Sequence, residues 1–145
     1  MEIFNPSTEE EQIAIGRQIA STCKAGDILL LQGDLGAGKT TLSKGIAQGL
    51  GLTEPLTSPT FTLMNLYELP QEINKITELV HIDTYRLEDE EGLKDIGVED
   101  YLGSPNTLCI IEWPGKITEL LKNKKTILLE LEHTKDGGRM IKKTV

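Results

Sequence analysis

Residues 33–40 read Gly-Asp-Leu-Gly-Ala-Gly-Lys-Thr, a complete phosphate-binding loop of the form G-x-x-x-x-G-K-[ST]. The apolar stretch 27–32 before the loop is typical of a buried strand, and Leu42, Ile46 and Leu50 after it lie on one face of a helix. In this order, the loop's backbone N–H groups and the helix N-terminus can surround an anion. The sequence therefore predicts a site for the phosphates of a nucleoside triphosphate.

The residues of this loop have distinct expected roles. Lys39 is expected to reach the β- and γ-phosphates, and the Thr40 hydroxyl is placed to ligate Mg²⁺. The glycines let the backbone curl around an anion without clashes from Cβ atoms. The predicted nucleotide-binding residues of the loop are Asp34, Leu35, Gly36, Ala37, Gly38, Lys39, Thr40 and Thr41. The alternative is a plain glycine turn between a strand and a helix, which the flanking pattern disfavours.

Two apolar runs further along the chain end in acidic residues. Residues 79–82 precede Asp83, which is the Walker B pattern, and residues 108–111 precede Glu112. Because parallel strands end at the same edge of a sheet, both carboxylates are expected beside the phosphate loop. Phosphoryl chemistry needs such groups to hold Mg²⁺ and to orient an attacking water. We predict that Asp83 and Glu112 are the catalytic and magnesium-organising carboxylates, with the division of these two roles left open.

The composition restricts the class of protein. The chain has 145 residues, which is enough for one domain with a single core. Its net charge of −8 argues against direct binding to a nucleic-acid backbone. The sequence contains neither an apolar run that could span a bilayer nor the pattern of a signal peptide. We therefore expect a cytoplasmic protein without membrane contact, in which Cys23 and Cys109 are buried thiols rather than a disulfide.

The charge is unevenly distributed along the chain. Residues 1–115 contain 7 basic and 19 acidic residues, whereas residues 116–145 contain 8 basic and 4 acidic residues. Two interpretations remain open for this basic C-terminal region. Its lysines either form a solvated rim that protects a sheet edge, or they form a docking face for an acidic partner or for RNA held by another protein.

Alternating helix and strand patterns predict one α/β domain, a single P-loop NTPase domain whose mostly parallel central sheet has antiparallel additions and is flanked by helices. Ser7 is expected to cap a first helix that ends near Gly26, with Glu10 completing a capping box. Residues 88–95 are expected to form an acidic helical turn. The other expected strands are 2–5, 61–69, 77–82, 108–111, 126–132 and 139–144, of which the last two form a hairpin around residues 136–138.

Four further positions have two interpretations each. Thr60, in the segment 58–60, belongs either to a switch that senses the γ-phosphate or its magnesium, or to an ordinary turn. Arg86 either stabilises charge on the transferred phosphoryl group or pairs with nearby acids. Trp113 either packs over the nucleotide or a partner, or packs within the protein. His81 is expected to be a satisfied buried histidine rather than a catalytic base.

The motifs that the sequence lacks restrict which nucleotide base and which type of reaction are expected. The sequence lacks the Asn-Lys-x-Asp motif that reads guanine, because neither Asn74-Lys75 nor Asn123-Lys124 is followed by aspartate at the required position. Adenine is therefore the expected base. The chain has three arginines, too few for the arginine-rich lid of a typical metabolite kinase. Hydrolysis coupled to a partner is expected rather than transfer to a small molecule.

Taken together, these motifs resemble the bacterial TsaE (YjeE) family. The resemblance is carried, in this order, by residues 33–41, 58–63, 81–87 and 111–114. It implies an ATPase required to form threonylcarbamoyladenosine at position 37 of tRNAs that read ANN codons. Proteins of this family hydrolyse ATP slowly on their own and act with the TsaD–TsaB heterodimer, which performs the carbamoyl transfer. Contact with tRNA would be indirect, through that complex.

The resemblance also implies roles for individual residues, with ATP and Mg²⁺ as cofactors. It assigns phosphate and Mg²⁺ binding to Lys39 and Thr40, a switch segment to Thr60, and hydrolysis or metal binding to Asp83 and Glu112. One hypothesis is that the ATP-bound form docks on TsaD–TsaB and that hydrolysis then releases or resets this partner. Two other classes remain open, namely a small-molecule or protein kinase, and a nucleotide-dependent adaptor whose hydrolysis is incidental.

Overall fold

The computed structural model describes residues 1–34, 37–53, 64–84, 97–112 and 117–145. Its elements, in chain order, are β1 (Glu2–Phe4), α1 (Glu9–Thr22), β2 (Ile28–Gly33), α2 (Lys39–Gly49), β3 (Met64–Ile73), β4 (Ile76–Asp83), the 3₁₀ turn η1 (Val98–Asp100), β5 (Thr107–Glu112), β6 (Ile127–His133) and β7 (Arg139–Thr144). In the part of the chain that the structure describes, no helix has the length and apolar character needed to cross a membrane.

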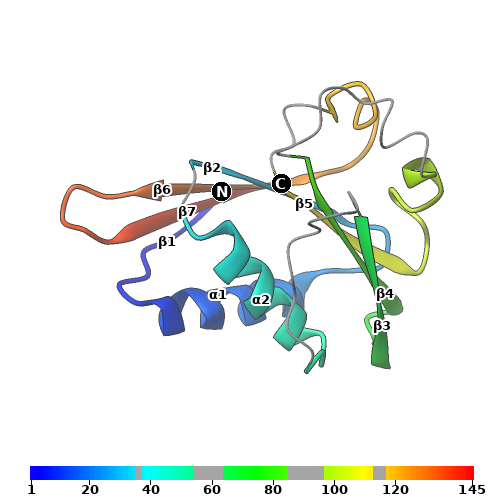
Figure 1. Cartoon of the computed structure of the whole chain (residues 1–145), viewed down its shortest axis with the longest axis horizontal. Coiled ribbons are helices and arrows are strands. Elements are labelled where there is room, and N and C mark those ends of the chain that lie inside the picture. Colours follow the sequence, from blue (N-terminus) through cyan, green and yellow to red (C-terminus); the bar gives the residue numbers. More distant parts are fainter. Residues whose placement is uncertain (35–36, 54–63, 85–96, 113–116) are drawn as a thin grey trace.

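The described strands form a seven-stranded sheet in the order β1-β7-β6-β2-β5-β4-β3 (Figure 1). The four central strands, β6, β2, β5 and β4, pair in parallel. At the edges, β7, β1 and β3 pair antiparallel with their neighbours. The predicted fold class, with a parallel centre and antiparallel additions, is confirmed. The next described strand after α2, β3, is one of these antiparallel edge strands, and β5 and β6 are the parallel neighbours of β2.

Apolar residues bury both faces of β2, β5 and β4. In β2, Leu29 and Leu31 belong to the core formed with α1 and α2. On the opposite face, Ile28 belongs to a second core that includes Val98 and Ile117. Figure 1 shows α1 and α2 together on one side of the sheet. The loop that precedes α2 therefore starts from a strand that is held on both faces.

The helices α1 and α2 approach each other closely at two glycines. A Cβ atom at Gly16 would lie 2.6 Å from the carbonyl oxygen of Leu42, and a Cβ atom at Gly45 would lie 2.2 Å from that of Ile13. Both distances are too short for a side chain. The absence of side chains at these positions thus allows α2 to lie directly against α1, which sets the position of the N-terminus of α2.

The cap of α1 differs from the prediction by one residue. The Thr8 hydroxyl, rather than that of Ser7, accepts the N–H of Glu11 at 3.1 Å. In return, the Glu11 carboxylate accepts the N–H of Ser7 at 2.5 Å. The sequence contains two overlapping capping patterns, one from Ser7 to Glu10 and one from Thr8 to Glu11, so spacing alone could not choose between them.

The hairpin of β3 and β4 turns at Asn74 and Lys75. Both residues have positive φ angles, of 50° and 68°, as a tight two-residue hairpin turn requires. As a result, β3 extends to Ile73, beyond its predicted end at residue 69. Residues 61–63 of the predicted strand and the predicted helical turn 88–95 lie outside the described residues.

The remaining predicted boundaries agree with the structure to within a few residues. The first helix ends at Thr22 rather than near Gly26. Strands are confirmed at the predicted positions 2–5, 27–32, 77–82, 108–111, 126–132 and 139–144. Cys23 and Cys109 are free and buried, as predicted. Burial raises the pKa of Cys23 to about 12 and that of Cys109 to about 11, so both thiols stay protonated.

We expect Gly45→Ala to destabilise the fold, because the added methyl group would meet the Ile13 carbonyl oxygen at 2.2 Å. Overpacking of this kind costs about 1–3 kcal/mol or more, and the better helix propensity of alanine, worth about 1 kcal/mol, offsets only part of it. Urea unfolding measures the change. Lys44→Ala, at the exposed neighbouring position, is the matched control and should change the free energy of unfolding by about 0.5 kcal/mol or less. A Gly45→Ala variant as stable as the wild type would contradict the proposed importance of this contact.

Candidate nucleotide site

The N-terminus of α2 is arranged to receive an anion. The helix begins at Lys39, and its N-cap Gly38 has a φ of 99° and provides no capping side chain. Its first turn contains no acidic residue, whereas α1 begins with the Thr8 cap and three glutamates. The N–H groups of a first helical turn have no partners within the helix, and the helix dipole favours negative charge beside them. In α1, side chains of the protein supply that negative charge, and in α2 they do not.

The Lys39 side chain is folded back on the loop. Its Nζ donates hydrogen bonds to the carbonyl oxygens of Gly33 at 2.6 Å and Asp34 at 3.0 Å. Burial lowers the pKa of Lys39, and the carboxylates of Glu112, Asp83 and Asp34 act in the opposite direction. The ammonium group therefore lies within electrostatic reach of the two acids that the sequence singled out.

Asp83 and Glu112 lie at the same edge of the sheet as the loop. They pair directly with each other in the β4–β5 ladder, and Glu112 also pairs with Leu31 of β2. Asp83 is partly buried, and Glu112 is only 2% exposed. The structure thus brings Lys39, Asp83 and Glu112 together at the carboxyl ends of parallel strands, while the chemical roles predicted for the two acids stay predictions.

Glu112 is held by two residues that sequence reasoning did not connect with it. Nε2 of His81 lies 2.5 Å from its Oε2. Thr84 donates its backbone N–H and its hydroxyl to the Glu112 carbonyl oxygen, at 3.1 and 3.0 Å. The prediction of a satisfied buried histidine is right for Nε2 only, because Nδ1 is buried without a hydrogen-bond partner among the described residues. The available signal was the two-residue spacing of His81 and Asp83, which places both on one face of β4.

A second buried network holds the loop from the side of α1. Gln12, which is fully buried, donates from Nε2 to the Gly38 carbonyl oxygen at 2.7 Å. Its Oε1 accepts a hydrogen bond from Nη1 of Arg139 at 2.7 Å. A Cβ atom at Gly38 would lie 2.1 Å from Gln12 Nε2, so this approach requires glycine. Sequence reasoning missed both residues, although a glutamine on the apolar stripe of α1, four residues before Gly16, was a usable signal.

The other predicted nucleotide-binding residues are only partly covered by the structure. Ala37 is buried, Thr41 is partly exposed and Thr40 is exposed at the start of α2. The predicted residues Leu35, Gly36, Thr60, Arg86 and Trp113 lie outside the described residues.

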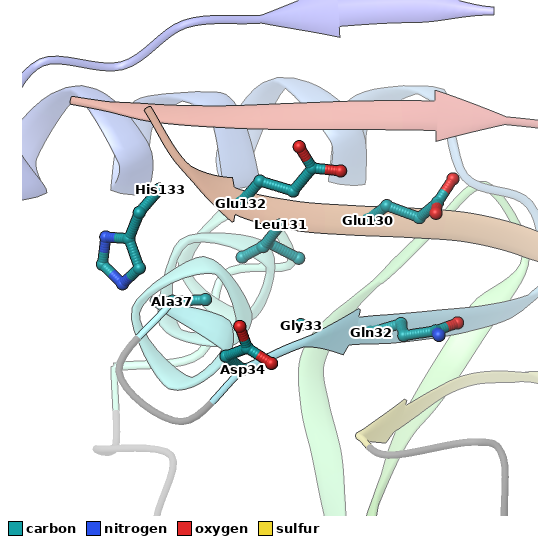
Figure 2. A pocket seen from close by; sticks show the side chains of 8 residues that line it. All are labelled: Gln32, Gly33, Asp34, Ala37, Glu130, Leu131, Glu132 and His133. Carbon is teal, nitrogen blue, oxygen red and sulfur yellow. The ribbon is translucent and has the colours of Figure 1, made fainter. Parts of the chain in front are cut away.

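A cavity of about 370 Å³ lies beside the loop, on the side of β2 that faces β6 (Figure 2). Its lining includes three carboxylates, those of Asp34, Glu130 and Glu132, together with Ala37. Three negative side chains disfavour a phosphate chain in this cavity. The phosphates are better accommodated by Lys39 and the N-terminus of α2.

The basic C-terminal residues are not gathered at this edge. Arg139 contacts the loop network, whereas Lys142 and Lys143 each lie within 3.8 Å of a glutamate oxygen. The lysines of residues 122–125 precede β6, whose start lies at the opposite end of the parallel sheet from the loop. The sheet-edge interpretation does not hold for Lys142 and Lys143, because both pair with β1 on the outer side of β7 and Lys143 is only 8% exposed. The docking interpretation stays untested.

The acidic groups suit magnesium only in combination with other oxygen ligands. Within the described ranges, no group of three or more His, Cys, Asp or Glu side chains is arranged to hold a metal ion. Mg²⁺ is commonly bound by one or two carboxylates together with the phosphates of a nucleotide. The oxygen donors of Thr40, Asp83 and Glu112 fit this pattern, because all three belong to elements that end or begin at the same edge.

Comparison with known proteins identifies the family. Residues 6–141 match the family described as threonylcarbamoyl adenosine biosynthesis protein TsaE. Two relatives named tRNA threonylcarbamoyladenosine biosynthesis protein TsaE are those of Bacillus subtilis and Treponema pallidum. The first is 42% identical over 116 residues, which cover 80% of this chain and 68% of the relative. The second is 37% identical over 126 residues, which cover 87% of each chain.

A solved structure agrees with this result. The crystal structure of YdiB from Bacillus subtilis superposes with a TM-score of 0.77 and 32% sequence identity, and the match covers 97% of this chain and 82% of that one. The fold and the sequence thus indicate the same relatives, and the chain belongs to the TsaE family.

Proposed function

We propose that this protein is an ATPase that binds ATP and Mg²⁺ at the loop 33–41 and supports threonylcarbamoyladenosine formation at adenosine 37 of tRNAs that read ANN codons. The observation that carries the proposal is the position of Lys39 at the uncapped start of α2, within electrostatic reach of Asp83 and Glu112. Membership of the TsaE family supports the biosynthetic role. Such a reaction belongs in the cytoplasm, where tRNA is modified.

In this proposal, different residues bind the phosphates, hold the metal ion and orient the attacking water. The N–H groups at the start of α2 bind the phosphates, and Lys39 exchanges its loop carbonyl partners for phosphate oxygens. Thr40, with Asp83 or Glu112, would hold Mg²⁺, which supplies positive charge against the phosphate oxygens when bound. Asp83, the more exposed of the two acids, is suited to accept a hydrogen bond from the attacking water.

The proposed partner is the TsaD–TsaB heterodimer, through which the protein would act on tRNA indirectly. The net charge of −8 supports an indirect role, because this chain would repel a nucleic-acid backbone. In this proposal, the ATP-bound form docks on TsaD–TsaB, the partner completes the site through residues 58–60 or Arg86, and hydrolysis resets the complex. Equal ATP turnover with and without TsaD–TsaB would contradict activation by the partner.

Lys39→Ala should weaken ATP binding by about ten- to a hundredfold, because a hydrogen bond from a charged group contributes about 1.5–3 kcal/mol. Titration with a fluorescent ATP analogue measures the affinity, and the same variant should fail to support tRNA modification. Lys44→Ala is the matched control, since Lys44 is an exposed lysine of the same helix. Wild-type protein that binds no Mg²⁺·ATP, with or without TsaD–TsaB, would overturn the proposed function.

Asp83→Asn and Glu112→Gln should retain most of the affinity for ATP and lose about a hundredfold or more in turnover, because they remove charge used in proton transfer or metal binding. ATP hydrolysis is measured in the presence of TsaD–TsaB. Glu78→Gln, near the other end of β4, is the control and should leave turnover unchanged. A double variant at Asp83 and Glu112 that binds ATP and still supports modification would favour the adaptor, and transfer of labelled phosphate to an acceptor would favour the kinase.

Gln12→Leu should lower nucleotide affinity by several-fold to about tenfold, because the Gly38 carbonyl loses a buried hydrogen bond that fixes the loop. Arg139→Ala should have a smaller effect of the same sign. If Arg139 acts through Gln12, the double variant should bind like Gln12→Leu alone. Gln18→Leu, at an exposed position of the same helix, is the control, and a Gln12→Leu variant with wild-type affinity would contradict this role for the network.

A further inference from the structure

The proposed function assigns no role to the buried residue His81. On β4 it precedes Asp83 by two residues, and its ladder partner on β5 is Ile110, two residues before Glu112. Both His81 and Glu112 therefore project on the same face of the sheet. Nε2 of His81 lies 2.5 Å from Oε2 of Glu112, and the two side chains are 1% and 3% exposed.

The geometry of this contact suits one tautomer of the histidine. An ionised carboxylate only accepts hydrogen bonds, so beside it the tautomer with a proton on Nε2 forms the hydrogen bond. Nδ1 is buried and has no hydrogen-bond partner in the part of the chain that the structure describes. Burying an unsatisfied ring nitrogen is unfavourable, and an apolar side chain would fill the same space without that cost. The contact with Glu112 is thus the interaction that distinguishes histidine from an apolar residue here.

We propose that His81 is a positioning residue that fixes the Glu112 carboxylate for metal binding at the nucleotide site, an inference that rests on the proposed function. The main chain of Glu112 is already fixed, because Thr84 donates two hydrogen bonds to its carbonyl oxygen. His81 constrains the side chain of Glu112 in the same way, through its contact with Oε2. A metal ion held by Glu112 would then meet the carboxylate in one orientation of the side chain.

The expected size of the effect comes from comparable sites. Residues that hydrogen-bond to a metal ligand without touching the metal typically contribute 10–100-fold to metal affinity or activity, as a rough range. The loss of His81 should therefore act mainly on metal affinity. Phosphate binding by Lys39 and the start of α2 should be preserved, because the hydrogen bond of His81 goes to Glu112 rather than to the loop.

Two polar substitutions of similar size separate the role of Nε2 from that of bulk. The amide of glutamine can reach the position of Nε2, whereas the amide of asparagine ends near Nδ1. With ADP bound and Mn²⁺ as the probe in place of Mg²⁺, paramagnetic resonance measures metal affinity without turnover. We expect His81→Asn to bind Mn²⁺ about tenfold more weakly and His81→Gln to stay within about threefold of the wild type. His133→Asn, at the exposed second histidine, is the matched control.

A double variant tests whether His81 acts through Glu112. In a Glu112→Gln background, adding His81→Asn should change Mn²⁺ affinity by less than about twofold, because the group that His81 positions is already altered. A full tenfold loss in that background would overturn the proposal. Equal Mn²⁺ affinities of His81→Asn and the wild type would overturn it as well.

Two controls distinguish failure of this inference from failure of the proposed function. ADP binding in EDTA should be the same within about twofold for wild type and His81→Asn, and a wild type that binds no ADP would contradict the proposed function itself. In wild-type protein without nucleotide or metal, nitrogen-edited NMR should detect a slowly exchanging Nε2–H proton of His81 that shifts in Glu112→Gln. Absence of that signal would overturn the positioning role independently of any ligand.

Discussion

The parallel pairing of β2, β5 and β4 determines where the groups of the site lie. Leu31, Glu112 and Asp83 occupy successive positions across this part of the sheet, at the point where the loop leaves β2. Side chains alternate between faces along a strand, so a slip of one residue would turn an acid toward the opposite core around Val98. The apolar residues that precede each acid are buried in defined cores on both faces, and this burial prevents the slip. The burial of these apolar residues thus fixes the strand register, and the strand register fixes the positions of the acids in the site.

The electrostatics of the site favour a cation beside a bound polyphosphate. Lys39 is already surrounded by the acids Asp34, Asp83 and Glu112 in a chain of net charge −8. A triphosphate placed there meets repulsion from the same carboxylates unless positive charge stands between them. Divalent metal ions are often the largest local charge in such sites. The arrangement therefore links nucleotide binding to metal binding, and the geometry of Glu112 bears on both.

Local patterns in the sequence were sufficient to locate Lys39, Asp83 and Glu112, because each belongs to a strand, loop or helix start that is defined within about ten residues. The parallel centre of the sheet and the closing hairpin followed in the same way. The contacts that hold these residues were not predictable. Gln12 meets Gly38 and Arg139 across 26 and 127 residues of sequence, and His81 meets Glu112 across 31. The cap at Thr8 was missed for a different reason, since two overlapping patterns of equal quality competed for the same helix start.

The residues that hold the site in place limit which of its properties a partner protein could change. Gln12 fixes the loop from α1, and His81 of β4 and Thr84, directly after β4, fix Glu112. Groups held in this way lose little further freedom when a ligand binds, so nucleotide and metal affinity should depend little on the proposed partner. Activation by the partner would then act through groups that enter the site at the transition state. It would raise the turnover number rather than the affinity for ATP, since interactions made only in the transition state act on that parameter.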